Sequence, residues 1–189
     1  MTGRRVADEV GDVQHRTSHQ QAAERGPVGV DADARIGAEL AAVVAGARRR
    51  ALRDGDRQID TAHLLHTLLE SDPEVRELFG GGPQIARLLG YLVQRSIGYG
   101  LRWQGSVEDS GAVPTVTGDG WSPVAAAVMT AAYERATRRG DLLAEGVDLL
   151  AALITEPGSR AVEVLGRAGV DVRELLARLE GAAGRGVEA

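Results

Sequence analysis

An internal repeat constrains the fold of this chain more than any other feature of its sequence. Residues 51–69 read ALRDGDRQIDTAHLLHTLL, and residues 136–154, which lie 85 positions further on, read ATRRGDLLAEGVDLLAALI. The two segments share an alanine, an arginine, a Gly-Asp pair and three leucines at equivalent positions. Residues 85–92 pair with residues 172–179 in the same way, at an offset of 87. A duplication that keeps turns and apolar stripes in register predicts two similar units in tandem.

Each unit is predicted to contain four helices. Apolar residues recur at helical spacing from Ile36, and Gly55 is expected to end this first helix. Asp60 is expected to cap a second helix with a leucine stripe, and Pro73 and Pro83 to open a third and a fourth. The second unit repeats this order from residue 123 onward. The predicted fold class is therefore all-α, a tandem repeat of two four-helix units related by a pseudo-two-fold axis.

Changes in composition predict the boundaries of these units. Residues 1–30 are polar and are expected to form a flexible N-terminal tail. The first repeat is expected over residues 31–96 and the second over residues 121–181. Between them, residues 97–120 hold six glycines and one proline without a helical period, which indicates an irregular linker. Residues 182–189 are expected to form a C-terminal tail.

The residue types that are missing exclude several kinds of chemistry. The chain has no cysteine, which excludes disulfides, thiolate metal sites and cysteine nucleophiles. It also has no lysine, so all 22 basic residues are arginine, and neither a P-loop lysine nor Schiff-base chemistry is available. No G-x-S-x-G or HExxH motif is present. We therefore expect a protein that is not an enzyme and that has no cofactor.

Charge and hydropathy limit the classes of partner and the cellular location that we expect for the protein. A net charge of -5 and a pI near 5.4 argue against bulk nucleic-acid binding. No run of 18 apolar residues and no apolar signal core occur, which predicts a cytoplasmic protein without a membrane partner. The bias toward Ala, Gly, Arg and Val without lysine is typical of a GC-rich genome, such as an actinobacterial one.

Three motifs give the chain a resemblance to a known family. Residues 60–65 (DTAHLL) are similar to the G-T-E-H-[IL]-L motif of the Clp N-terminal domain, the module that heads unfoldases of the ClpC and ClpA type. Residues 121–123 (WSP) are similar to its F-T-P motif, and residues 165–171 (LGRAGVD) to its L-x-x-L-G-V-[DS] ending. The resemblance covers about residues 33–181 and implies the same tandem Clp-repeat fold.

The resemblance implies a non-catalytic module that binds peptides or proteins. Such a module would act as an adaptor, regulator or decoy in proteolysis of the ClpC–ClpP type. The implied partners are a ClpC-type unfoldase, an adaptor or a substrate peptide, and cyclic-peptide antibiotics are a further implied ligand. Family unfoldases continue into ATPase modules, whereas this sequence contains no G-x-x-x-x-G-K-[ST] motif, so a stand-alone domain is expected. A helical DNA-binding or transcription-associated regulator is the alternative hypothesis.

The best-known binding chemistry of the family is expected to be changed here. Some ClpC N-terminal domains bind phosphoarginine through the glutamate in the G-T-E-H motif of each repeat. The matching positions in this chain are Ala62 and Val147, which cannot pair with a guanidinium group. Glu145 lies two residues from Val147 and could replace it only with a different geometry.

Two groups of residues are candidates for partner contacts. Trp121, Met129 and Tyr133 could line an apolar groove for a peptide or an antibiotic, although a tryptophan at this position also fits a core plug. The second group is basic and could dock an acidic partner; it consists of Arg48, Arg49, Arg138 and Arg139. Positive charge near the C-terminal end of a helix also suits the helix dipole without any partner.

Two histidines three residues apart, His63 and His66, are the remaining candidates. A histidine pair at this helical spacing can bind zinc or copper. The second repeat does not preserve the pair, because it has Asp148 and Ala151 at the matching positions. A structural role is therefore expected for His63, and no metal site is predicted.

Overall fold

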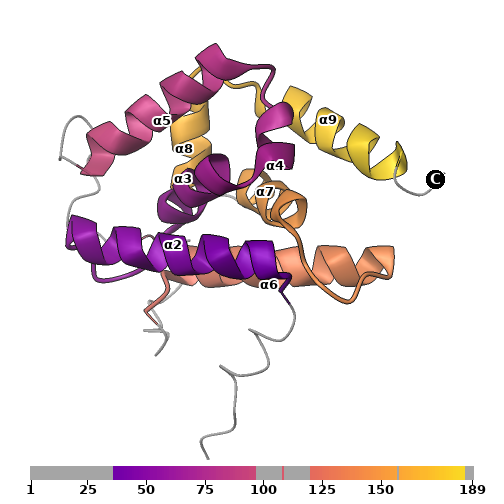
Figure 1. Ribbon diagram of the computed structural model, residues 1–189, viewed down its shortest axis with the longest axis horizontal. Coiled ribbons are helices and arrows are strands. Elements are labelled where there is room, and N and C mark those ends of the chain that lie inside the picture. The colour runs from indigo at the N-terminus through magenta and orange to yellow at the C-terminus, as the bar shows by residue number, and fades with distance from the viewer. Residues whose placement is uncertain (1–35, 97–107, 109–119, 157, 186–189) are drawn as a thin grey trace, which may run out of the picture.

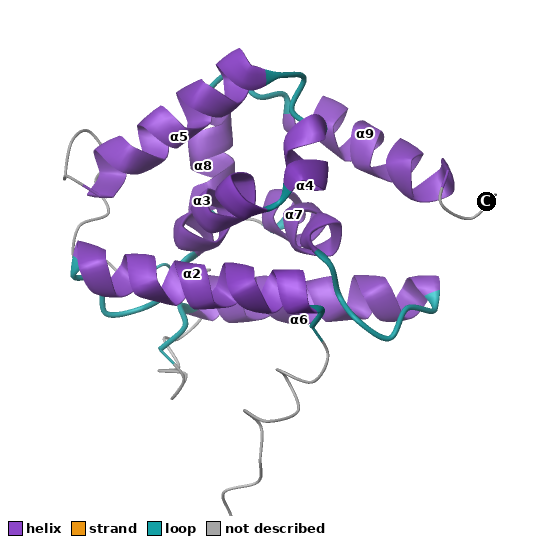
Figure 2. Ribbon diagram, in the orientation of Figure 1, coloured by secondary structure: helices purple, strands orange, loops and turns teal. Residues whose placement is uncertain are grey.

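The computed structural model describes residues 36–96, 108, 120–156 and 158–185, and this part of the chain contains helices and no strand, as predicted (Figures 1 and 2). None of its helices is both long and apolar enough to cross a membrane. The eight helices are α2 (Ala38–Asp54), α3 (Thr61–Ser71), α4 (Pro73–Glu77), α5 (Gly82–Ser96), α6 (Pro123–Arg139), α7 (Gly146–Thr155), α8 (Arg160–Arg167) and α9 (Val172–Arg185).

Helices α3 and α7 occupy the centre of the molecule. In Figure 1, α2 and α6 lie on one side of this central pair, and α4, α5, α8 and α9 lie on the other. Nine of the 11 residues of α3 and eight of the 10 residues of α7 are buried. A helix that is buried on almost every side needs apolar residues all round, which explains the dense leucine content of both segments.

Two short backbone contacts join the repeats, and they follow the predicted pseudo-two-fold symmetry. One isolated β-bridge pairs Ile36 with Ala144, and the other pairs Trp121 with Ile59. Each partner in the first bridge lies 85 residues from its counterpart in the second, so the bridges are equivalent under the repeat. The N–H of Ser122 donates to the carbonyl of Ile59 at 2.8 Å. The segment before the first helix of each repeat is therefore held by the other repeat.

The predicted helix ends are confirmed at the glycines. Gly55 and Gly140 have φ values of 74° and 88°, and each donates its N–H to a carbonyl of the last turn of α2 or α6. Glycine reaches this left-handed conformation without the steric cost that a Cβ brings. Side chains cap the starts of α3, α4 and α6, and at the start of α3 Asp60 accepts from His63 N at 2.9 Å.

The expectations for the N-terminal tail (residues 1–30) fall outside the described residues. The same holds for the predicted linker (residues 97–120) except for Glu108 and Gly120. Glu108 is buried, with only 4% of its surface exposed.

Candidate functional site

Three helix N-termini converge on one buried carboxylate, that of Glu108. The Oε2 atom of Glu108 accepts hydrogen bonds from Thr61 N at 2.9 Å and from Ser122 Oγ at 2.7 Å. Its Oε1 atom accepts from Arg160 N at 2.8 Å and from the hydroxyl of Thr61. Thr61, Ser122 and Arg160 stand at the starts of α3, α6 and α8, whose dipoles also favour a negative charge there. We call Thr61, Ser122, Ser159, Arg160 and Glu108 the Glu108 site.

The hydroxyl groups of the site are oriented by their other partners. The Thr61 hydroxyl oxygen accepts from Ser159 Oγ and from Ala161 N, both at 3.1 Å. Ser122 Oγ accepts from Ala125 N at 3.0 Å, which caps α6. Since the lone pairs of both oxygens are engaged in this way, each hydroxyl proton is available for the carboxylate.

A buried ion pair joins the two repeats beside the Glu108 site. Arg160 Nη1 lies 2.6 Å from Asp60 Oδ2, and the two side chains are 9% and 3% exposed. The other carboxylate oxygen of Asp60 caps α3 by accepting from His63 N. Asp60 therefore caps the start of one helix and anchors the start of another from the opposite repeat.

His63 completes the cap of α3. Its Nδ1 lies 3.1 Å from Asp60 N and 2.9 Å from Asp60 Oδ1. We assign Nδ1 as the acceptor, because the backbone N–H can only donate, and the ring proton then resides on Nε2. His63 Nε2 lies 3.2 Å from Asp56 Oδ2. The imidazole therefore has a structural role, as one half of a reciprocal capping box at the start of α3.

The same residues form the one grouping in the described part of the chain whose ligand atoms could surround a metal ion. One ligand atom from each of Asp56, Asp60 and His63 lies within 4.8 Å of the others. Asp60 already uses one oxygen for the helix cap and the other for Arg160. The cap and the ion pair explain the grouping without a metal.

His66 is buried on the next turn of α3, at 4% exposure, with Nε2 3.3 Å from Glu70 Oε1. Burial, and secondarily the positive charge of Arg50, lowers the pKa of His66 from 6.5 to about 4. The imidazole is therefore neutral at physiological pH.

The predicted apolar groove residues all contact the core. Met129 is buried at 6% exposure, and Trp121 and Tyr133 are half-buried and pack against the same core. Met129 and Tyr133 lie one turn apart on α6. The part of Trp121 and Tyr133 that reaches solvent is what a ligand could contact, and the groove itself stays a prediction.

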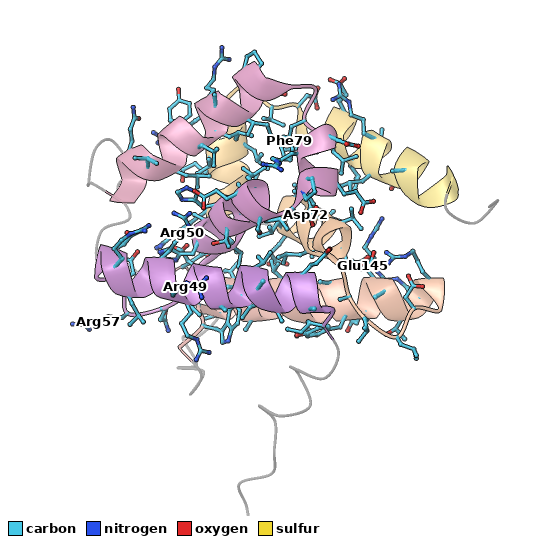
Figure 3. The ribbon with its side chains drawn as sticks, in the orientation of Figure 1. Arg49, Arg50, Arg57, Asp72, Phe79 and Glu145 are labelled. Carbon is cyan, nitrogen blue, oxygen red and sulfur yellow. The ribbon has the colours of Figure 1, made fainter. Side chains whose placement is uncertain are left out.

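The basic residues of the first repeat differ in their surroundings. Arg48 and Arg49 are exposed, and neither has a carboxylate partner among the described residues. Arg50 lies between α2 and α3, where it pairs with Glu70, and Arg57 points away from the ribbon (Figure 3). Arg48 and Arg49 are thus available to an acidic partner.

The basic residues predicted as a docking site in the second repeat lie beside carboxylates. Arg139 Nη2 lies 2.9 Å from Asp148 Oδ2 and 2.8 Å from Asp141 Oδ2. The hydrogen bond to Asp148 is the main reason that the pKa of Arg139 is raised. Arg138 is exposed and lies 3.9 Å from Glu134. The repeat therefore does not present the same basic surface twice.

The two positions that match the family's phosphoarginine glutamates are apolar in their surroundings as well. Ala62 is completely buried, and Val147 is half-buried and packs against the core. Glu145 is exposed, and its N–H, not its carboxylate, contacts the neighbouring Asp148 at 3.1 Å.

Sequence reasoning missed the Glu108 site. Ser and Thr at helix starts are recognisable caps, so Ser122 could have been found by its position before Pro123. Glu108 carries no such signal, because it lies in a glycine-rich segment without a period, next to another acidic residue. Only the fold brings it to Thr61, 47 positions earlier in the sequence.

The duplicated helix order and the crossed contacts between repeats define an all-helical domain built from two similar units. Residues 121–189 match the family of the Clp repeat (R) N-terminal domain. The internal repeat gives the first half of the chain the same helix order as the matched half.

Solved structures share this fold. The N-terminal domain of the caseinolytic protease associated chaperone ClpD from Arabidopsis thaliana is 21% identical, with a TM-score of 0.57, over 79% of this chain and 95% of that one. The N-terminal domain of Hsp104 from Candida albicans is 13% identical, with a TM-score of 0.60, over 79% of this chain and 92% of that one. A comparison with curated proteins gives no significant match.

Proposed function

We propose that this protein is a non-catalytic protein-interaction module of the Clp type, which binds a peptide, an adaptor or an unfoldase and so modulates Clp-dependent proteolysis. The observation that carries the proposal is the two-repeat Clp N-terminal fold, whose second repeat also matches the family in sequence. Within this role, the domain acts as an adaptor, a regulator or a decoy that sequesters peptides.

The surface supports a role in binding. Arg48 and Arg49 offer positive charge without a partner in the described part of the chain. Two adjacent leucines in the turn between α6 and α7 are exposed, Leu142 at 92% and Leu143 at 44%. Neighbouring apolar side chains in solvent are more typical of a contact surface than of a free one.

The direct test measures binding to a purified ClpC-type unfoldase, with and without ClpP. We expect saturable binding that weakens about tenfold in Arg48→Glu/Arg49→Glu, because the reversed charges remove the attraction to an acidic surface. Arg173→Glu, an exposed arginine on α9, is the matched charge reversal and should leave affinity unchanged. If neither unfoldase nor protease binds, the proposed role in proteolysis is wrong.

A decoy for cyclic-peptide antibiotics would use the predicted groove. Trp121→Ala should then weaken cyclic-peptide binding by about tenfold or more, since a half-buried indole supplies a large apolar contact. Tyr91→Ala, a half-buried aromatic on α5, serves as the control. Equal affinity of both variants and the wild type would show that the groove lies elsewhere.

A further inference from the structure

The pseudo-symmetry of the fold shows what is unusual about the Glu108 site. Gly146 at the start of α7 corresponds to Thr61 at the start of α3. Asp72, the N-cap of α4, corresponds to Ser159, the N-cap of α8. The two places can therefore be compared group by group.

At the start of α7, the negative charge belongs to Asp72, the residue that caps the start of α4. A Cβ atom on Gly146 would lie 1.9 Å from Asp72 Oδ2, so the Asp72 carboxylate packs directly against this helix start. Asp72 also accepts from Val75 N at 3.0 Å, and it is the single residue between the end of α3 and the start of α4. It cannot leave without ending the cap of α4.

At the start of α3, the same positions carry hydroxyl groups, and the carboxylate comes from elsewhere. Ser159 and Thr61 hydrogen-bond each other at 3.1 Å, and Glu108 enters from a position that belongs to no described helix. The withdrawal of Glu108 would leave the side-chain caps of α3 and α6 in place, because Asp60 and Ser122 supply them, and would free the Arg160 N–H at the start of α8 for another acceptor. The occupant of this site can therefore exchange while the fold persists.

The groups around Glu108 select an oxyanion. Two backbone N–H groups, of Thr61 and Arg160, and two hydroxyl groups, of Thr61 and Ser122, all donate to the carboxylate. The hydroxyl oxygens already accept from other donors, so the site offers protons and no free acceptor. A neutral amide would place its own N–H groups against donors, whereas a carboxylate satisfies all of them.

We infer that the Glu108 site is an exchangeable carboxylate-binding site, in which Glu108 is the resident ligand and an acidic side chain or C-terminal carboxylate of a bound peptide competes with it. As a peptide site it presupposes the proposed interaction function, whereas its anion chemistry is a property of the chain alone. Glu108 thus acts as an internal competitor that lowers the affinity for acidic peptides.

The first experiment tests the anion site without any partner. Glu108→Ala should lower Tm by about 5 °C or more, because four donors lose their acceptor. Sodium acetate at about 100 mM should restore at least half of that loss in the variant and raise the wild-type Tm no more than sodium chloride of equal ionic strength does. Equal effects of acetate and chloride on the variant would overturn the site. Rescue by inorganic phosphate alone would overturn the carboxylate assignment.

The second experiment tests exchange with a peptide. The probe is a fluorescein-labelled peptide with glutamates between glycines, and its glutamine version is the uncharged control. A tethered competitor acts at an effective concentration of about millimolar or more, so Glu108→Ala should bind the acidic probe about tenfold more tightly than the wild type does. Glu134→Ala, which removes an exposed carboxylate on α6, controls for net charge.

Glu108→Gln keeps the side-chain volume and serves if Glu108→Ala does not fold. The NH2 group of the glutamine would face N–H and O–H donors of the site and compete poorly for them. The variant should therefore also bind the acidic probe more tightly than the wild type does. Affinities equal to that of the wild type in the folded Glu108 variants would overturn the exchange. Acetate rescue would be unaffected by a failure to bind ClpC or ClpP, so the two proposals fail separately.

Discussion

Arg139 donates to both oxygens of the completely buried carboxylate of Asp148. The equivalent positions of the first repeat hold Asp54 and His63, with His63 Nε2 3.8 Å from Asp54 Oδ2. The acidic and basic residues have exchanged places between the repeats, while the polar contact between the first and second helices is kept in both. The repeat thus preserves an interaction whose residues are not preserved.

The swapped positions of acid and base predict that the pair of the first repeat can replace the Arg139–Asp148 pair of the second, provided that both residues are changed together. Asp148→His alone should cost about 2–3 kcal/mol, because it places an imidazole against Arg139 and removes a bidentate hydrogen bond. Adding Arg139→Asp should recover at least about 1 kcal/mol, since the double variant copies the pair of the first repeat. Urea unfolding of the wild type, both single variants and the double variant gives the coupling energy. Strictly additive losses would show that the two pairs are not equivalent.

The repeat also explains how much of the fold was predictable. Helix ends at Gly55 and Gly140 follow from local backbone chemistry, and the burial of the leucines in α3 follows from their spacing. These features depend on neighbours within a few residues along the chain, which a sequence displays directly.

The candidate site was less accessible to sequence reasoning, because its contacts join distant residues. Arg160 was not singled out, yet it pairs with Asp60 across 100 positions. The arginines that were singled out in the two repeats differ in their surroundings, since Arg139 is held by Asp148 while Arg49 is exposed.

The ion pair between Asp60 and Arg160 is expected to stabilise the docking of the two repeats. Arg160→Met keeps the backbone N–H of the Glu108 site but leaves a buried Asp60 carboxylate without its cation, at a cost of about 3 kcal/mol. Arg167→Met on the same helix breaks an exposed pair with Glu163 and should cost less than about 0.5 kcal/mol. Thermal and urea unfolding measure both. Equal losses in the two variants would mean that burial of the pair is unimportant.

His66 is expected to make the fold sensitive to mild acid. The pKa of His66 in the folded protein is about 4, below its ordinary value of 6.5, so the unfolded chain binds the proton more tightly. The stability that comes from the neutral imidazole is complete above pH 6.5 and declines as the pH falls from 6.5 toward 4, by at most about 3 kcal/mol.

His66→Gln removes this titration while keeping a polar side chain beside Glu70. The free energy of unfolding of the variant should therefore fall less steeply than that of the wild type between pH 6.5 and pH 4. Urea unfolding at half-unit pH steps measures the two slopes. Parallel curves would show that other groups cause the acid sensitivity.

The close packing of Asp72 against the start of α7 gives the last prediction. Gly146→Ala places a methyl group within 1.9 Å of Asp72 Oδ2, so the carboxylate must move, and we expect a loss of about 1–3 kcal/mol. Gly90→Ala is the matched control, because Gly90 lies inside α5 with open space around the added methyl group. There alanine should stabilise the protein by about 0.5–1 kcal/mol through its higher helix propensity.

A second variant separates the clash from other effects at the helix start. Asp72→Ala alone should cost about 1 kcal/mol, because it removes the N-cap of α4. In the double variant with Gly146→Ala, the methyl group no longer meets a carboxylate, so the combined loss should be smaller than the sum of the single losses. Chemical unfolding of the four proteins gives this difference. Losses that simply add would show that Asp72 already stands clear of Gly146 in solution, and the comparison of Asp72 with the exchangeable Glu108 would lose its basis.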